Sequence, residues 1–242
     1  MKRVLCFLLV LVMCFAMATP AFAATEKRDT LVIGDTTYHI TTTSNAITVV
    51  DEKNSYEAVY VPSTGDLTIT DLRGKSTSRC VNINAMANSI LASQRVGTNN
   101  TRAGNGSNSS KDNEYAYERS SKMYNNKYYT FWEIQIPNQI KMTWANTNNT
   151  SALEDFKDNV DELRELEDSV AGAWGTTILA VVLSVVGSFA LPALGAALVA
   201  ALSALVGGDD LVTLLTYGTD MKNCRINCED LFGEVIVYST PT

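Results

Sequence analysis

The chain has 242 residues and is acidic, with 26 Asp and Glu against 19 Lys and Arg and a formal net charge of −7. Nucleic-acid binding needs clustered Lys and Arg, so this balance argues against a nucleic-acid partner. The single histidine, His39, excludes a site built from several histidines, and the sequence contains no common catalytic or phosphate-binding motif. Pairing of His39 with a distant Cys or Ser has no local support. We therefore expect a half-buried strand histidine, no catalytic residues and no cofactor.

Residues 1–23 have the features of a secretory signal peptide. Lys2 and Arg3 precede an apolar run, and Ala21-Phe22-Ala23 matches the small-x-small pattern that signal peptidase cleaves. We expect this segment to be removed and the protein to be secreted. Retention in the cell membrane is the alternative.

Residues 24–96 are predicted to form a β-rich region. From residue 30 to residue 72, β-branched and aromatic residues alternate with polar ones. Turn signals interrupt this pattern at Gly34-Asp35, Ser44-Asn45, Asp51 and Pro62-Ser63-Thr64-Gly65. The alternation is typical of an antiparallel meander with one face covered and the other in water. Residues 81–94 carry apolar residues at spacings that suit a short helix.

Residues 97–114 are predicted to be a polar flexible loop. Of the 17 positions from 97 to 113, 13 are Asn, Gly, Ser or Thr, and none is a large apolar residue. Such a segment buries too little apolar surface to offset its ordering entropy.

Residues 115–150 are rich in aromatic residues and are predicted to form a β-hairpin that turns at Pro137-Asn138. Apolar residues lie symmetrically about this turn at even positions, which would place them on one face. They are Trp132, Ile134, Ile136, Ile140, Met142 and Trp144. Two interpretations of this face are open: the core of a small sheet, or an aromatic surface for sugars or a membrane interface.

An amphipathic helix is predicted to begin at Ser151, which forms a capping box with Glu154. The apolar stripe of this helix is Leu153, Phe156, Val160, Leu163, Leu166 and Val170. The opposite face carries eight Asp and Glu residues against Lys157 and Arg164. This face is either solvated, or a latch that protonation or a basic partner would release.

Residues 170–206 form a 37-residue apolar run inside a stretch without charge between Asp168 and Asp209. Residues 170–191, as one helix of about 33 Å, would cross a bilayer. Residues 193–206, at about 21 Å, would not. We therefore predict a hydrophobic helical hairpin that bends at Leu191-Pro192.

The candidate membrane-inserting residues are Trp174, Gly187, Leu191, Pro192, Gly195, Ala197 and Leu198. Three outcomes are open for the hairpin: a permanent anchor, a buried core of a soluble protein, or a hairpin shielded in solution that inserts into a target membrane. No Lys or Arg directly follows the run, which disfavours the anchor. The predicted signal peptide favours the third outcome.

After the run, Gly207 to Asp210 provide a stop and a cap, and Leu211, Leu214 and Leu215 indicate another short helix. Residues 235–238 are predicted to form a terminal strand.

Three cysteines, Cys80, Cys224 and Cys228, follow the predicted signal peptide. Export favours a disulfide, and Cys224 with Cys228 is one pairing, but the odd number leaves the pairing open. A zinc site would need a fourth ligand from His39 or an acid, so we expect no metal.

Several segments resemble a known family. Residues 132–137 read Trp-Glu-Ile-Gln-Ile-Pro, Thr143-Trp144 follow, and Asn149 leads to Leu153, Phe156, Lys157, Val160 and Asp161 before a Gly- and Ala-rich apolar segment. This pattern, over roughly residues 130 to 206, resembles the geobacillin-26-like large bacteriocins, which are secreted proteins of Gram-positive bacteria. The resemblance implies a signal peptide, a β-rich front, a hydrophobic helical tail and antibacterial activity without an enzymatic site.

We therefore expect an α+β fold, with an N-terminal antiparallel meander followed by an amphipathic helix and a hydrophobic helical hairpin. The expected function is that of a secreted, bacteriocin-like antibacterial protein that acts on target-cell membranes. Bacterial membrane lipid would be its partner, together with a cognate immunity protein or receptor. The alternative is a membrane-anchored cell-surface protein with a structural role, or one that binds a ligand through its aromatic hairpin.

Overall fold

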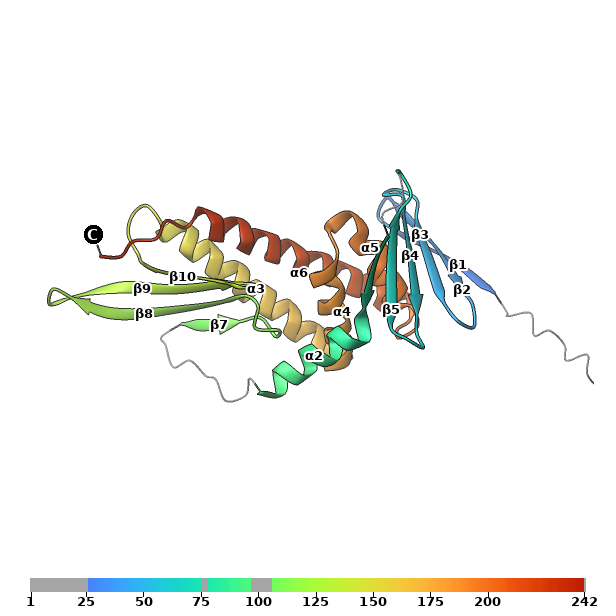
Figure 1. Cartoon of the computed structure of the whole chain (residues 1–242), viewed down its shortest axis with the longest axis horizontal. Coiled ribbons are helices and arrows are strands. Elements are labelled where there is room, and N and C mark those ends of the chain that lie inside the picture. Colours follow the sequence, from blue (N-terminus) through green and yellow to red (C-terminus); the bar gives the residue numbers. More distant parts are fainter. Residues whose placement is uncertain (1–25, 75–77, 97–105, 242) are drawn as a thin grey trace, which may run out of the picture.

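The computed structural model describes residues 26–74, 78–96 and 106–241, and it has an α+β fold. Two antiparallel sheets lie on different sides of a helical core (Figure 1). The predicted fold class is confirmed. The predicted signal peptide lies outside the described residues.

The first sheet is a six-stranded meander in which each strand pairs with the next along the chain. Its strands are β1 (Lys27–Ile33), β2 (Thr36–Thr42), β3 (Ile47–Asp51), β4 (Tyr56–Val61), β5 (Asp66–Asp71) and β6 (Ser78–Asn82). Alternate residues share one face and are buried there, among them Ile40, Val49 and Leu67. The apolar positions of the period-two pattern therefore lie on the covered face of the sheet. The predicted meander is confirmed, and β6 is an additional strand.

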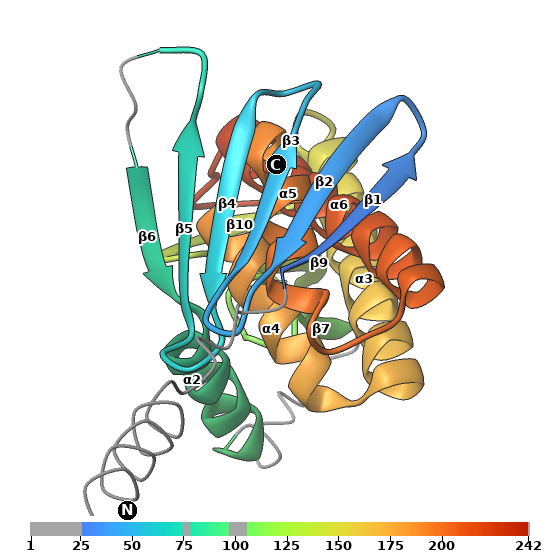
Figure 2. The same cartoon turned by 90° about the vertical axis from the view of Figure 1, so that its right-hand side faces the viewer.

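The helices of the described residues are α2 (Ile83–Val96), α3 (Thr150–Trp174), α4 (Thr176–Ser188), α5 (Leu191–Leu202) and α6 (Gly208–Glu234). α5 packs on the buried face of the six-stranded sheet, against β2 to β5, and α4 contacts α2, α3, α5 and α6. Figure 2 shows the helices layered behind this sheet. The two most apolar helices therefore form the centre of the core.

The start of α3 differs from the predicted capping box. The helix begins at Thr150 with Asn149 as its N-cap, and no side chain caps it. The buried Asn149 side chain instead donates from Nδ2 to the carbonyl oxygen of Ile236, at 3.0 Å. The Ser151 hydroxyl lies 3.3 Å from the Asp155 carboxylate rather than on a backbone amide. The helix start is thus held by the C-terminal segment, a contact that no local motif contains.

The predicted apolar stripe of α3 is fully buried at Leu153, Phe156, Val160, Leu163 and Val170, and Leu166 is partly buried. Glu167 is also fully buried. It lies four residues after Leu163 and three before Val170, so by spacing it belongs to the stripe. Glu167 is one of the eight acidic residues predicted for the opposite face of this helix, and for this residue the prediction was wrong.

The second sheet has the strand order β10-β9-β8-β7 and packs on α3 and α6. Its strands are β7 (Ser107–Ser109), β8 (Ala116–Tyr124), β9 (Lys127–Ile136) and β10 (Gln139–Trp144). The predicted loop over 97–114 lies partly outside the described residues and is wrong for the part that is described. β7 pairs with β8, Ser110 is fully buried, and the Asn108 side chain donates to Asp161 of α3 at 3.0 Å. Polar residues are ordered here by hydrogen bonds to distant elements.

The hairpin about Pro137-Asn138 is confirmed, but its predicted face is wrong. Ile136 pairs with Gln139 across the two-residue turn, so each even residue of β9 lies opposite an odd residue of β10. Trp132, Ile134 and Ile136 of β9 are buried, whereas Ile140 and Met142 on β10 are 54% and 53% exposed. Because side chains alternate with period two, a shift of one residue moves a strand's apolar set to the other face.

The C-terminal region contains a longer helix than predicted and no terminal strand. α6 has 27 residues, and polar residues between its buried positions obscure the periodicity beyond Leu215. Residues 235–238 lie beside β10 without a regular ladder. The Tyr238 N–H donates to the Thr143 hydroxyl at 2.8 Å, and the Trp144 N–H donates to the Tyr238 carbonyl at 3.3 Å.

Gly195 allows α5 to approach the six-stranded sheet closely. A Cβ atom at this position would lie 2.3 Å from the Tyr38 hydroxyl oxygen and 3.1 Å from its Cζ, and Tyr38 is buried. We expect Gly195→Ala to lower the free energy of unfolding by about 1 to 3 kcal/mol, because the added methyl group overpacks this contact. Gly172→Ala is the matched control, since its Cβ would meet nothing within 4 Å, and it should stabilise α3 by up to about 1 kcal/mol. Urea unfolding measures both, and equal stabilisation would contradict the tight contact.

Candidate functional site

α4 and α5 contain no charged residue and are buried along most of their length. The Ser184 and Ser188 hydroxyls of α4 each donate to the carbonyl oxygen four residues earlier, at 2.7 Å. The hydroxyl groups of both serines are therefore hydrogen-bonded within the helix, and α4 presents a largely apolar surface on all sides. A helix of this kind is stable only under a cover of protein or lipid.

The apolar run is not one long helix. Gly175 has φ +89°, a conformation that favours glycine, and it separates α3 from α4. The extended residues 189–190 then separate α4 from α5. The predicted single helix over 170–191 is therefore wrong, and the bend precedes Leu191 rather than lying at Leu191-Pro192. Pro192 lies in the first turn of α5, where its missing N–H costs no hydrogen bond.

α4 has 13 residues and α5 has 12. These lengths correspond to about 20 Å and 18 Å of helix. Within the described ranges, no helix is both long enough and apolar enough to cross a membrane.

Three of the predicted insertion residues lie in the protein interior. Ala197 and Leu198 are fully buried on α5. Leu198 packs so closely on α6 that a Cβ at Gly218 would lie 2.6 Å from its Cδ1, and Gly195 contacts Tyr38 of the sheet as described above. These residues therefore hold α5 between α6 and the six-stranded sheet.

The other four predicted insertion residues lie at helix ends. Leu191 and Pro192 are exposed at the start of α5, and Gly187 is exposed near the end of α4. Trp174 ends α3 and is partly buried, with its ring edge-on to Tyr217 of α6 at a centroid distance of 6.2 Å. The seven residues thus do not form one surface.

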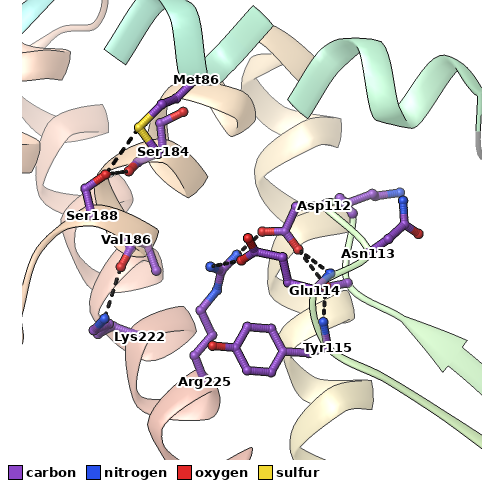
Figure 3. Close-up of polar contacts among 12 residues, drawn as sticks. Met86, Asp112, Asn113, Glu114, Tyr115, Ser184, Val186, Ser188, Lys222 and Arg225 are labelled. Carbon is purple, nitrogen blue, oxygen red and sulfur yellow. Dashed lines mark hydrogen bonds and ion pairs between the residues drawn. The ribbon is translucent and has the colours of Figure 1, made fainter. Parts of the chain in front are cut away.

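A charged cluster beside α4 joins α6 to the connection between β7 and β8 (Figure 3). Arg225 of α6 is 2% exposed. Its Nη2 is paired with the Asp112 carboxylate, and its Nη1 donates to Glu114 at 3.2 Å. Its guanidinium carbon lies 5.2 Å from the centre of the Tyr115 ring. We call Asp112, Glu114, Tyr115, Glu167 and Arg225 the Arg225 cluster.

Glu167 is the buried acid of this cluster. Its Oε2 accepts the backbone N–H of Lys111 at 2.5 Å, and its Oε1 has no hydrogen-bond partner among the described residues. Burial, and secondarily the charge of Asp112, raise the pKa of Glu167 to about 8. The carboxyl group is therefore protonated in most molecules at pH 7, which lowers the cost of burying it.

A pocket of about 200 Å³ lies beside the Arg225 cluster. Met86 and Ile90 of α2 and Leu183 and Gly187 of α4 line it together with the charged groups of Arg225, Asp112 and Glu114. Because two guanidinium nitrogens are already paired with carboxylates, the cluster is better suited to holding the fold together than to binding an anion. It links the elements that cover the end of α4.

The cysteines and His39 form no reactive centre with one another. Cys224 and Cys228 are buried free thiols, so the suggested disulfide is not formed, and Cys80 is free and exposed on β6. Burial raises the pKa of Cys224 and of Cys228 to about 12, which disfavours the nucleophilic thiolate. His39 lies on the open face of β2, with Nε2 2.7 Å from the Glu52 carboxylate. Across the described ranges, no group of three or more His, Cys, Asp or Glu side chains could hold a metal ion.

Sequence reasoning missed the Arg225 cluster. The spacing of Glu167 within the α3 stripe was an available signal. The spacing of Arg225 within α6 was a similar signal, because Arg225 lies four residues after Met221 and three before Cys228, and both of these residues are buried. Asp112 and Glu114 carried no signal, since the arginine with which they pair lies 113 and 111 positions further along the chain.

Comparisons with protein-family models, curated proteins and solved structures gave no match to this chain. The resemblance to the geobacillin-26-like bacteriocins therefore stays a prediction.

Proposed function

We propose that this protein is a secreted antibacterial protein that releases the α4–α5 hairpin from its cover and inserts it into the membrane of a target bacterium. The observation that carries this proposal is a stretch of 40 residues, 169–208, without a charged side chain. Its central helices lie at the middle of the fold. In water this segment needs a cover of protein, whereas in lipid it does not.

The free-energy cost of separating α4 and α5 from the elements that cover them differs between water and a bilayer. Burial of each Leu or Val side chain contributes about 1.5 to 3 kcal/mol, so releasing the hairpin into water forfeits a large apolar contribution. A bilayer offers a second apolar environment and would restore much of it. Lipid therefore lowers the cost of separating α4 and α5 from the sheet, α2, α3 and α6.

The helix lengths define what insertion requires. α4 is too short to cross the hydrocarbon layer, but residues 170–188 as one helix would measure about 28 Å, close to the layer's thickness of about 30 Å. Insertion by this route closes the break at Gly175 and joins the end of α3 to α4. Gly175 is thus the hinge of the proposed change.

Gly187→Asp is the sharpest test of insertion. Gly187 is exposed, so a new carboxylate there can be solvated in the folded protein, although it would lie beside the Asp112 and Glu114 carboxylates that already pair with Arg225. At the centre of a bilayer a carboxylate costs about 2.5 to 3.5 kcal/mol on insertion scales, and the cost falls toward the interface, where residue 187 of a 170–188 helix would lie. We expect roughly threefold to tenfold less dye release from liposomes, at about 1.4 kcal/mol per factor of ten.

Gly187→Ala is the matched control, because it adds a Cβ without charge and should retain full dye release. Circular dichroism establishes that both variants are folded. Full release by folded Gly187→Asp would overturn the insertion proposal. Ala197→Asp is a weaker probe, because Ala197 is fully buried and a carboxylate there would disrupt the fold itself.

A second candidate function is that of a membrane-anchored cell-surface protein that binds a ligand. The observation that favours ligand binding is the open face of β9 and β10, where Ile140 and Met142 are more than half exposed. The two candidates differ in where the mature protein is found. Export into the medium supports the first, and retention in the producer's membrane fraction supports the second.

A further inference from the structure

The turn between β8 and β9 forms a projection that we call the hairpin tip, residues 121–128. All eight residues are exposed. The tip extends past the helices at the end of the molecule opposite the six-stranded sheet (Figure 1). Strand pairing continues to Tyr124 and Lys127, and the two turn residues, Asn125 and Asn126, have φ of 46° and 58°. This turn geometry matches the twist of a regular hairpin.

The hairpin tip combines exposed apolar surface with positive charge. Tyr128 is 72% exposed, Met123 60% and Tyr124 37%. Lys122 and Lys127 are exposed beside them. Although the chain as a whole has a net charge of −7, residues 119–132 contain three basic residues and no acid. The tip is therefore a basic and aromatic end on an acidic molecule.

Apolar side chains lie on both faces of the hairpin tip. Met123 and Tyr128 pair on one face. Tyr124 lies on the other, with its ring centroid 6.1 Å from that of Trp144. A protein partner docked on one face would leave the other in water, whereas a lipid headgroup layer that surrounds the tip contacts both. Tyr rings and Lys side chains are also suited to the boundary between hydrocarbon and water.

We propose that the hairpin tip docks this protein on an anionic lipid surface, with Tyr124 and Tyr128 among the headgroups and Lys122 and Lys127 near the lipid phosphates. This inference rests on the proposed membrane function and adds the element that makes first contact. An acidic molecule with one basic end is oriented by a negative surface, which attracts that end and repels the rest. The tip lies far from α4 and α5, so docking and insertion are separate steps.

The test is partitioning of the full chain onto vesicles of phosphatidylglycerol with phosphatidylcholine, and onto vesicles of phosphatidylcholine alone. Lys122→Gln with Lys127→Gln should weaken partitioning onto the anionic vesicles roughly 25-fold, about fivefold for each lysine. High salt should weaken wild-type partitioning more than that of this double variant. Met123→Ser with Tyr128→Ser should weaken partitioning onto both kinds of vesicle.

The matched control is Lys53→Gln with Leu72→Ser, which removes an exposed lysine and an exposed leucine from turns of the six-stranded sheet. It should partition as the wild type does. The docking inference would be overturned if the tip variants are folded by circular dichroism and still partition as the wild type does. It would also be overturned if the wild type binds an immobilised acidic polypeptide but does not bind vesicles. Partitioning by the wild type without dye release would support docking and overturn insertion.

Discussion

Replacing Arg225 with methionine is expected to lower the free energy of unfolding by about 3 to 5 kcal/mol, because removal of one partner leaves buried charge without compensation. Arg225 is 2% exposed, and its loss would leave the Asp112 carboxylate, itself with a side chain 7% exposed, without its cation. Chemical denaturation measures the change. A loss below about 1 kcal/mol, the range of a surface ion pair, would contradict the structural role of the Arg225 cluster.

Arg73→Met is the matched control for this substitution. Arg73 pairs with Asp71 at 3.2 Å, but its side chain is 53% exposed, and such a pair contributes about 0 to 1 kcal/mol. The buried pair can also be tested by rescue. Asp112→Asn in the Arg225→Met background should recover part of the lost stability, because the unpaired charge is then removed as well.

The contribution of Glu167 to stability is expected to decrease as the pH rises from about 4.5 to about 8. Its pKa is raised from 4.5 to about 8 in the folded protein. Between these values the unfolded chain has released a proton that the folded protein keeps, so raising the pH favours unfolding. Below this window both states are protonated and above it both are ionised, so the contribution is then constant. The decrease amounts to a few kcal/mol, at about 1.4 kcal/mol per pKa unit.

Glu167→Gln isolates this contribution, because an amide of the same shape does not titrate. The difference in the free energy of unfolding between wild type and Glu167→Gln should change with pH across this window. The control is the same difference for the exposed Glu165→Gln. If the difference in the free energy of unfolding between wild type and Glu167→Gln does not change with pH, Glu167 is ionised in the folded protein. The upward direction given for its pKa shift would then be wrong.

The raised pKa of Glu167 bears on the hypothesis that the acidic face of α3 is a latch released by protonation. Protonation of Glu167 favours the folded state, so this residue does not act in a latch that acid releases. Only the exposed acids of α3, such as Asp158 and Glu162, remain candidates for that function. The latch itself stays a prediction.

Local periodicity determined much of this protein from the sequence alone. The meander, the hairpin about Pro137-Asn138, the apolar stripe of α3 and the apolar character of 170–206 each depend on neighbours within a few residues. Period two and period 3.6 are properties of an isolated strand or helix, so they can be read without knowing what covers it. The candidate insertion segment was found from its composition, since it is apolar and carries no charge.

The tertiary structure alone decided how these elements are joined and covered. Gly175 divides a run whose composition alone indicates one continuous helix. The open face of Ile140 and Met142, by contrast, follows from the predicted turn, because a two-residue turn pairs even residues of β9 with odd residues of β10. Arg225 pairs with Asp112 across 113 positions of the chain. The sequence between two such residues does not specify their pairing, because a buried charge can be compensated by any partner that the packing of the other elements brings within reach.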